Sequence, residues 1–232
     1  MDDLLRKNLL MKNALDEIKS DIQNLSPYPE KVKLVVVSKY SSTEEVMEAY
    51  NLGVRIFGEN KVQSLMEKKE YFQEKKIYDI SWDFIGNLQS NKVKYIYDFV
   101  RMIHSVNKLS LAEEINKRAT ALSRRVDVLL EINVLGEESK EGYLLENLKK
   151  DLEKLTKLEN INIIGLMTMA PFTENEKILR QVFAGLRKIK EIFNREIFNN
   201  KLVELSMGMT NDYKIALEEG ATIIRIGSKI FK

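Results

Sequence analysis

Short apolar runs alternate along the chain with longer segments in which apolar residues recur every three or four positions. The short runs have the length and composition of β-strands, and the longer segments have the spacing of amphipathic helices. Strands are therefore predicted over 34–38, 55–58, 82–86, 102–106, 126–133, 161–169, 202–206 and 222–226. Helices are predicted over 43–51, 61–75, 109–122, 144–158, 174–198 and 211–219, with a shorter helical segment over 91–97.

The first part of the chain has a helical pattern of its own. Apolar residues recur at helical spacing from Leu4 to Ile22, and the pattern stops before Pro27 and Pro29. Proline commonly follows the end of a helix, because it cannot continue the backbone hydrogen bonding. Residues 1–30 are therefore predicted to form an N-terminal helix and its lead-in, outside the repeating units that follow.

Eight strand and helix units within 232 residues favour a closed parallel barrel, the (β/α)8 TIM-type α/β fold, as a single domain over residues 1–232. No linker, low-complexity segment or obvious repeat divides the chain. The same alternation also generates a doubly wound open sheet, which stays open as the alternative.

The composition narrows the classes of function. The chain has 44% hydrophobic residues and 37 basic against 35 acidic residues, so its net charge of +2 offers no uniform field for nucleic acid or a membrane surface. It has no cysteine and one histidine, His104, which excludes disulfides and thiolate chemistry and makes a zinc or iron site unfavourable. The first ten residues mix charges with apolar residues, and no run is long enough to span a bilayer, so a cytoplasmic location is expected.

Candidate chemistry lies at the ends of predicted strands. Lys39 follows the first strand, and a lysine amine can form a Schiff base with a carbonyl. Small-residue loops follow the seventh strand (206–210) and the eighth strand (225–228), where barrels commonly hold a phosphate on backbone N–H groups. The first and eighth strands are neighbours in a closed barrel. The sequence therefore predicts that one phosphorylated aldehyde contacts all three segments.

Other polar and aromatic residues have structural interpretations. Ser42 and Glu45 form a capping-box pattern, and Asp212 is expected to satisfy the start of its helix. His104 is interpreted equally well as a packing residue or as a ligand contact at the barrel mouth. Alternating apolar side chains in strands usually pack in the core or at the mouth, which is the interpretation for Trp82, Met102, Met167 and Met169.

Nearly the whole chain resembles the pyridoxal phosphate homeostasis proteins. The segments that carry the resemblance are Val37-Ser38-Lys39, Phe57-Gly58-Glu59-Asn60 with Val62-Gln63, Phe84-Ile85-Gly86-Asn87-Leu88-Gln89-Ser90-Asn91-Lys92, Ile103-His104-Ser105-Val106, Ser139-Lys140 followed by Gly142, Gly165-Leu166-Met167, and the loops 206–210 and 225–228. The resemblance implies a barrel similar to the N-terminal domain of alanine racemase.

The resemblance also implies the cofactor and its site. It implies pyridoxal 5'-phosphate (PLP) as a Schiff base on Lys39, with Asn60 near the cofactor and Arg225 facing the pyridine nitrogen. It further implies a phosphate site on the two terminal loops, and His104 and Met167 are candidate mouth residues. The implied phosphate-site residues are Ser206, Gly208, Met209, Thr210, Gly227 and Ser228.

The implied family role is to carry and buffer PLP for intracellular PLP homeostasis, without significant turnover. A permanent cation at Arg225 would disfavour protonation of the ring and weaken it as an electron sink. Racemases with this arrangement add a tyrosine from a separate β domain as a second base, and the sequence ends at Lys232 without such a domain. PLP-dependent apoenzymes are the candidate recipients, and a monomer is expected.

Two other functions stay open. One is a PLP-dependent amino-acid racemase of low activity, which uses Lys39 and an unidentified second base. The other is a barrel enzyme in which Lys39 forms a Schiff base with a phosphorylated sugar or a similar substrate. The chain also departs from the family pattern at Asp83, where many relatives have histidine, and at its end, which lacks the usual small tail after Phe231 and Lys232.

Overall fold

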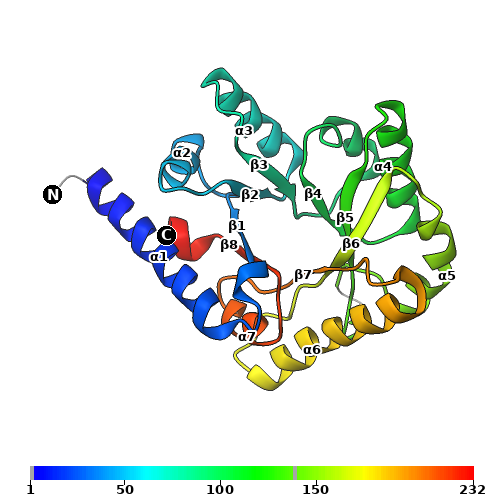
Figure 1. The fold of residues 1–232 in the computed structure, drawn as a ribbon. Helices are drawn as coiled ribbons and strands as arrows, with labels where there is room; N and C mark the ends of the chain where they lie inside the picture. The colour runs from blue at the N-terminus through cyan, green and yellow to red at the C-terminus, as the bar shows by residue number, and fades with distance from the viewer. Residues whose placement is uncertain (1–2, 138–139) are drawn as a thin grey trace.

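The computed structural model describes residues 3–137 and 140–232, in which eight parallel strands close into a barrel in chain order (Figure 1). The strands are β1 (Lys33–Val37), β2 (Ile56–Glu59), β3 (Ser81–Phe84), β4 (Met102–Val106), β5 (Val126–Glu131), β6 (Ile161–Met167), β7 (Glu204–Ser206) and β8 (Ile223–Ile226). The first strand pairs with the last from Lys33 opposite Ile223 to Val36 opposite Ile226, which closes the sheet. The predicted closed barrel is confirmed, and the open sheet is not formed.

Helices surround the barrel and occupy most of the predicted ranges (Figure 1). They are α1 (Asp3–Leu25), α2 (Thr43–Asn51), α3 (Val62–Glu74), α4 (Leu109–Ala121), α5 (Leu145–Thr156), α6 (Glu176–Phe193), α7 (Tyr213–Glu218) and α8 (Ser228–Phe231). The elements η1 (Pro29–Lys31) and η2 (Ser90–Tyr95) are short 3-10 helices. A π-helical turn, η3 (Asn194–Phe198), ends the segment that is predicted as one helix over 174–198. Within the described residues, no helix combines the length and apolar character that crossing a membrane requires.

The N-terminal helix α1 packs against the two C-terminal helices, as Figure 1 shows for the blue and red ends of the chain. Its buried face consists of Met11, Leu15, Ile18 and Ile22. The Tyr213 hydroxyl at the start of α7 donates a hydrogen bond of 2.5 Å to Asp21, and Lys229 of α8 pairs with Glu17 at 2.9 Å. Helix α1 therefore supports the part of the chain that carries the last two strand loops.

Two apolar layers form the core. Inside the barrel, Val35 packs in a buried cluster with Met102 and Met167. Outside it, Trp82 packs between Phe57 and Phe72, with ring centroids 5.8 Å from each, in the layer under the helices. Trp82, Met102 and Met167 are therefore core residues, and Met169 lies at the barrel mouth with 43% of its surface exposed, so both places named in the interpretation are occupied.

One predicted strand is shorter than its apolar pattern. Strand β7 begins at Glu204, although the run starts at Leu202. The side-chain amide of Asn194 donates to the Leu202 carbonyl at 2.8 Å and accepts from its N–H at 2.9 Å. Because this side chain occupies the backbone groups of Leu202, they are not available to the ladder, and the strand starts later.

Candidate functional site

The carboxyl ends of the strands surround a cavity of about 580 Å³. That volume lies within the range of roughly 300–1,000 Å³ that is typical of small-ligand sites. Seven of the nine predicted binding residues line it: Lys39, Asn60, Met209, Thr210, Arg225, Gly227 and Ser228. The cavity therefore brings together segments from both ends of the chain, as the strand order predicts.

Lys39 reaches the cavity from a tight turn at the end of β1. The Ser41 N–H donates to the Ser38 carbonyl at 2.9 Å, so Lys39 and Tyr40 are the two central residues of the turn. Side chains alternate across a strand, and Val35 points into the barrel, so Lys39 continues the inward-facing row. Its ammonium lies 5.0 Å from the centre of the exposed Tyr40 ring.

The loops after β7 and β8 meet at the cavity wall. The Ser228 hydroxyl donates to the Thr210 hydroxyl at 3.1 Å, and the Arg225 N–H donates to the Gly208 carbonyl at 2.9 Å. Among the residues that the structure describes, the backbone N–H groups of Thr210, Gly227 and Ser228 donate no hydrogen bond. The Thr210 hydroxyl and three N–H groups are therefore available to donate to an anion here.

Two glycines allow this close approach. Gly208 has a φ of +93°, which L-residues with side chains rarely adopt, and a Cβ there would lie 2.6 Å from the Ala216 side chain. A Cβ on Gly227 would lie 2.7 Å from the carbonyl oxygen of Val37. The loops after β7 and β8 therefore depend on glycine at both positions.

Asp212 differs from its predicted role. It is the N-cap residue of α7, but its carboxylate makes no capping hydrogen bond to that helix and instead accepts from the Met209 N–H at 2.5 Å. Burial raises the pKa of Asp212, while this hydrogen bond and the nearby Arg225 lower it. The carboxylate thus accepts a hydrogen bond from one N–H of the predicted phosphate loop, which fixes the shape of that loop and leaves this N–H unavailable to a phosphate.

Below the cavity, a chain of hydrogen bonds crosses the barrel interior. Arg225 donates to the Ser206 hydroxyl at 2.5 Å, Ser206 lies 2.9 Å from Nδ1 of His104, and Nε2 of His104 lies 3.0 Å from Asp83. Asp83 also accepts two hydrogen bonds from Arg101. Because the Asp83 carboxylate can only accept when ionised, Nε2 carries the histidine proton and Nδ1 accepts from Ser206.

The barrel interior holds four residues that the sequence analysis singled out. His104 and Met167, the candidate mouth residues, are buried in the barrel and are not among the described residues that line the cavity. Burial lowers the pKa of His104, against the opposing effect of Asp83, which favours a neutral ring. Ser206 lies behind Arg225 rather than at the cavity surface, and Asp83 has a defined partner on each side.

Arg225 is a buried cation at the cavity. It is 4% exposed, and its second terminal nitrogen donates to the Thr168 carbonyl at 3.0 Å. Burial lowers the pKa of Arg225 to about 10, while Asp212 and Glu131 raise it. The side chain therefore stays charged near neutral pH and is held in one orientation.

Two acidic residues of the cavity were not predicted from the sequence. Glu131, at the end of β5, is 3% exposed, and burial raises the pKa of Glu131 to about 7 despite the opposing charge of Arg225. Glu141 accepts hydrogen bonds from Asn87 at 3.0 Å and from Asn107 at 3.1 Å, which joins three loops at the mouth. The sequence feature that could have identified Glu131 is its position, because it is an acidic residue near the end of the predicted strand 126–133.

Asn60 lines the same cavity because the loop after β3 passes close to it. A Cβ on Gly86 would lie 2.2 Å from the Asn60 carbonyl oxygen, so glycine is required at that position. Of the segments that carry the family resemblance, Ser139 lies outside the described residues, and Lys140 pairs with Glu137 at 3.0 Å.

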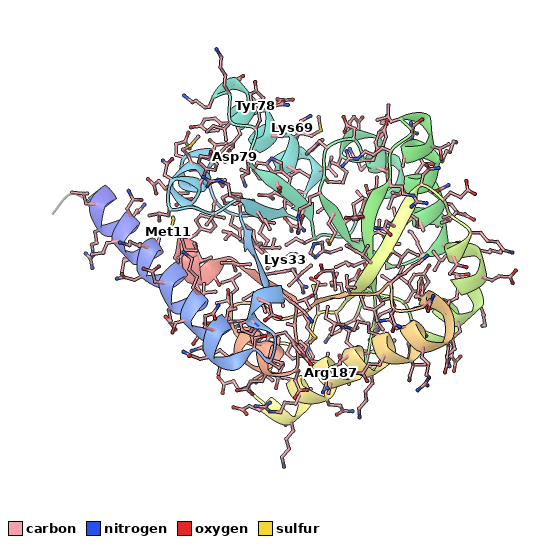
Figure 2. All side chains as sticks on the ribbon, viewed as in Figure 1. Met11, Lys33, Lys69, Tyr78, Asp79 and Arg187 are labelled. Carbon is pink, nitrogen blue, oxygen red and sulfur yellow. The ribbon has the colours of Figure 1, made fainter. Side chains whose placement is uncertain are left out.

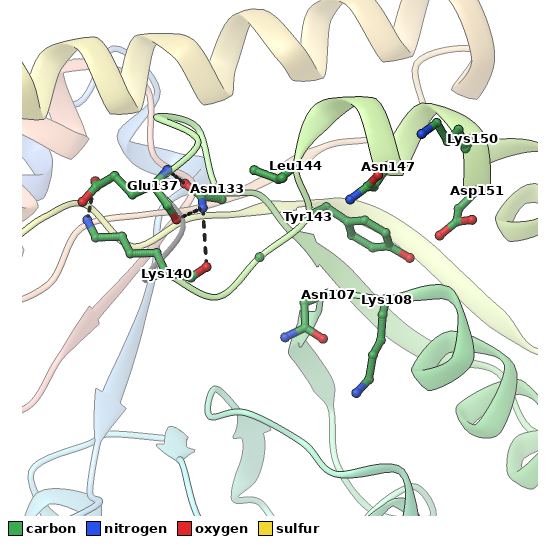
Figure 3. Close-up of a pocket in the computed structure, with 11 residues that line it drawn as sticks. Asn107, Lys108, Asn133, Glu137, Lys140, Tyr143, Leu144, Asn147, Lys150 and Asp151 are labelled. Atoms are coloured by element: carbon green, nitrogen blue, oxygen red, sulfur yellow. Dashed lines mark hydrogen bonds and ion pairs between the residues drawn. The ribbon is translucent and has the colours of Figure 1, made fainter.

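A second cavity, of about 480 Å³, lies next to the loop after β5 (Figure 3). Asn133 shapes that loop by donating to the Glu137 carbonyl at 2.7 Å. Lysine and acidic side chains line this cavity together, including Lys108 and Asp151. None of the residues predicted to bind a cofactor is among those lining it, so it is separate from the site at the barrel mouth.

Comparisons with known proteins agree with the fold and the sequence motifs. The chain matches the family model of the alanine racemase N-terminal domain over residues 14–232. The pyridoxal phosphate homeostasis protein of Aquifex aeolicus is 45% identical over 199 residues, which cover 86% of each protein.

Solved structures show the same similarity in three dimensions. PipY of Synechococcus elongatus with PLP bound superposes with a TM-score of 0.87 at 32% identity, covering 96% of this chain and 100% of PipY. Alanine racemase of Clostridium difficile superposes with a TM-score of 0.74 at 15% identity, covering 95% of this chain and 56% of the racemase. At that identity the racemase shares the fold alone.

Proposed function

Because the chain belongs to the family of pyridoxal phosphate homeostasis proteins, we propose that it binds PLP in the cavity at the barrel mouth and holds it for PLP homeostasis. The observation that carries this proposal is that Lys39 and the two loops after β7 and β8 line one cavity. An amine for an aldehyde and an anion site for a phosphate are thereby present together.

The residues present fit the cofactor. The Thr210 hydroxyl, oriented by Ser228, and the N–H groups of the two loops offer donors for a phosphate, and the glycines leave space for it next to the backbone. Helices α7 and α8 have six and four residues, so these donors rather than a long helix dipole supply the attraction. Arg225 offers a fixed cation to a ring nitrogen.

We infer that the cofactor is held covalently as a Schiff base on Lys39. When bound, PLP supplies an aldehyde carbon that condenses with a primary amine and releases water, and a second amine can later replace the lysine. Lys39 lines the cavity from an exposed turn, so an incoming amine has access to the same carbon. Exposure therefore suits a protein that both takes up and releases its cargo.

Arg225 supports binding without significant turnover. A cation opposite a ring nitrogen disfavours protonation of that nitrogen, because like charges repel. Without a protonated ring, the cofactor is a weaker electron sink for carbanion chemistry. The two hydrogen bonds to Ser206 and Thr168 hold the guanidinium, so the residue cannot easily turn away.

A racemase of low activity is the second candidate, and Glu131 is the observation that favours it. A carboxyl group in the cavity with a pKa of about 7 can exchange a proton near neutral pH. With Lys39 as the other base, it would complete the pair that two-base racemisation needs.

The test compares the two candidates on one preparation. The PLP-loaded protein is incubated in D2O with single enantiomers of common amino acids, and optical purity and Cα deuterium are followed. For a carrier we expect a stoichiometric visible band, transfer of PLP to an added apoenzyme, and no deuterium incorporation above buffer. Catalytic racemisation that is lost in both Lys39→Ala and Glu131→Gln would favour the racemase instead.

A further inference from the structure

A buried ion pair lies on the outer side of β1, behind the cavity. Lys68 of α3 is 4% exposed and pairs with Glu59 of β2, which is fully buried. Lysine is rarely buried to this extent without a specific partner. Neither residue lines the cavity, so direct contact with a ligand there does not explain the pair.

Both members of the pair also contact the residue before Lys39. The Lys68 ammonium donates to the Ser38 carbonyl at 2.6 Å, and the Ser38 hydroxyl donates to Glu59 at 2.7 Å. The Ser38 N–H donates to the Gly58 carbonyl at 3.0 Å. The N–H, carbonyl and hydroxyl of Ser38 are therefore each held by a group on β2 or α3.

The pair is poorly arranged for stability alone. One Glu59 carboxylate oxygen accepts from both Lys68 and Ser38, while the other, Oε2, has no hydrogen-bond partner in the described part of the chain. Buried ion pairs are weak contributors to stability, because removing both charges from water offsets their attraction. An unpartnered buried oxygen adds to that cost. The arrangement is better explained by the position that it imposes on Ser38.

Ser38 is the first residue of the turn that presents Lys39. Its carbonyl accepts both the Ser41 N–H, which closes the turn, and the Lys68 ammonium. Rotation of the peptide between Ser38 and Lys39 would break both hydrogen bonds and change the direction in which the Lys39 side chain leaves the backbone. The Lys68 ammonium opposes that rotation.

We propose that Lys68 and Glu59 are positioning residues that fix the Ser38 turn and so aim the Lys39 amine into the cavity. The inference rests on the proposed function and adds the device that orients its central residue. Holding a reacting group in one orientation removes conformational freedom that bond formation would otherwise have to restrict. Losing Lys68 should therefore slow and weaken attachment at Lys39 without altering the cavity lining.

The test uses Lys68→Met, with Lys69→Met as the matched control. Lys69, labelled in Figure 2, is the next residue of α3 and carries the same charge. Its ammonium lies 4.2 Å from the centre of the Phe99 ring instead of contacting Ser38. The first readout is amide hydrogen exchange of the peptide that contains residues 38–42, measured without cofactor. We expect exchange at the Ser41 amide to become about tenfold faster in Lys68→Met only, because losing one charge-assisted hydrogen bond changes the opening equilibrium by about that factor. Unchanged exchange would overturn the inference whether or not the protein binds PLP.

The second readout is the rate and midpoint of PLP attachment, followed by visible absorbance. Lys68→Met should show a slower rate and a midpoint raised about tenfold, on the same reasoning. If wild type binds no PLP, the proposed function fails, while the exchange result still decides whether the turn is held. Normal attachment in Lys68→Met beside a binding wild type would refute the positioning role.

A double variant separates positioning from folding. Lys68→Met combined with Glu59→Leu removes both buried charges, which is often neutral for stability. We expect its thermal midpoint to return toward that of wild type, while fast exchange at Ser41 and slow attachment remain. Recovery of all three properties together would show that the pair acts through stability alone, and the inference would be wrong.

Discussion

The Arg225 guanidinium donates a 2.5 Å hydrogen bond to the Ser206 hydroxyl inside the barrel. Through Ser206 and the neutral His104, this cation of the cavity is connected to the Asp83 carboxylate on β3. Each group in the series donates to the next, so the Asp83 charge fixes the histidine proton, and the histidine fixes the direction of the serine hydroxyl.

Replacing Asp83 tests this series. Asp83→Asn keeps the side-chain shape but removes the charge that pairs with Arg101 and accepts from His104. We expect the free energy of unfolding to fall by about 3 kcal/mol, as for other broken buried ion pairs. Urea unfolding monitored by Trp82 fluorescence measures the change.

Asp79→Asn is the control for that experiment. Asp79, labelled in Figure 2, pairs with Arg55 at 2.8 Å, but its side chain is 60% exposed. Exposed pairs contribute about 1 kcal/mol or less, so the control should unfold close to wild type. Equal losses in the two variants would contradict the role given to the buried series.

Gly227→Ala tests the phosphate site. The added Cβ would meet the Val37 carbonyl oxygen at 2.7 Å and displace the loop that bears Ser228. We expect the dissociation constant for PLP to rise at least about tenfold, the cost of one charged hydrogen bond. Binding of pyridoxal, which lacks the phosphate, should change little.

The comparison of the two ligands by absorbance titration separates a phosphate effect from a general one. Gly53→Ala serves as the control, because its φ of +95° also strains an alanine but its added Cβ would meet nothing within 4 Å. If Gly227→Ala weakened PLP and pyridoxal equally, the phosphate assignment of this loop would be wrong.

Glu131 makes stability depend on pH. Its pKa is raised to about 7 in the folded protein from 4.5. The folded state therefore binds the proton more tightly, and the associated stability is present below pH 4.5 and is lost as the pH rises through about 7. Glu131→Gln should remove this dependence. The free energy of unfolding of the variant should rise relative to that of wild type by roughly 2–3 kcal/mol between pH 4.5 and pH 8.

Thermal midpoints measured from pH 4.5 to 8 for wild type and Glu131→Gln check this prediction. The difference between the two proteins should grow with pH. A difference that is constant across the range would mean that the carboxyl group is not shifted as the structure indicates.

Strand and helix periodicity was sufficient for the barrel but not for every boundary. The short apolar run 34–38 predicted the first strand and placed Lys39 at its end, and the closed barrel makes this strand the neighbour of the eighth. The start of β7 could not be predicted, since it depends on hydrogen bonds between the Asn194 side chain, in the preceding turn, and the Leu202 backbone.

The site shows the same limit. Lys39 and the glycines of the terminal loops are visible in the sequence because their chemistry is local. Glu131 and the Lys68–Glu59 pair are not, since their properties come from burial and from partners on other elements. His104 is a further case, because its strand-end position left a packing residue and a ligand contact equally open, whereas its hydrogen bonds with Asp83 and Ser206 hold it inside the barrel.

The central claim is that PLP attaches to Lys39. The most direct test adds PLP to the purified protein, records the visible spectrum, reduces with borohydride and maps the modified peptide by mass spectrometry, with Lys39→Ala in parallel. We predict a visible band and a reduced adduct on Lys39 in wild type, with no adduct at position 39 and a strongly weakened band in the variant. No adduct in wild type, or an adduct only on another lysine, would contradict the account.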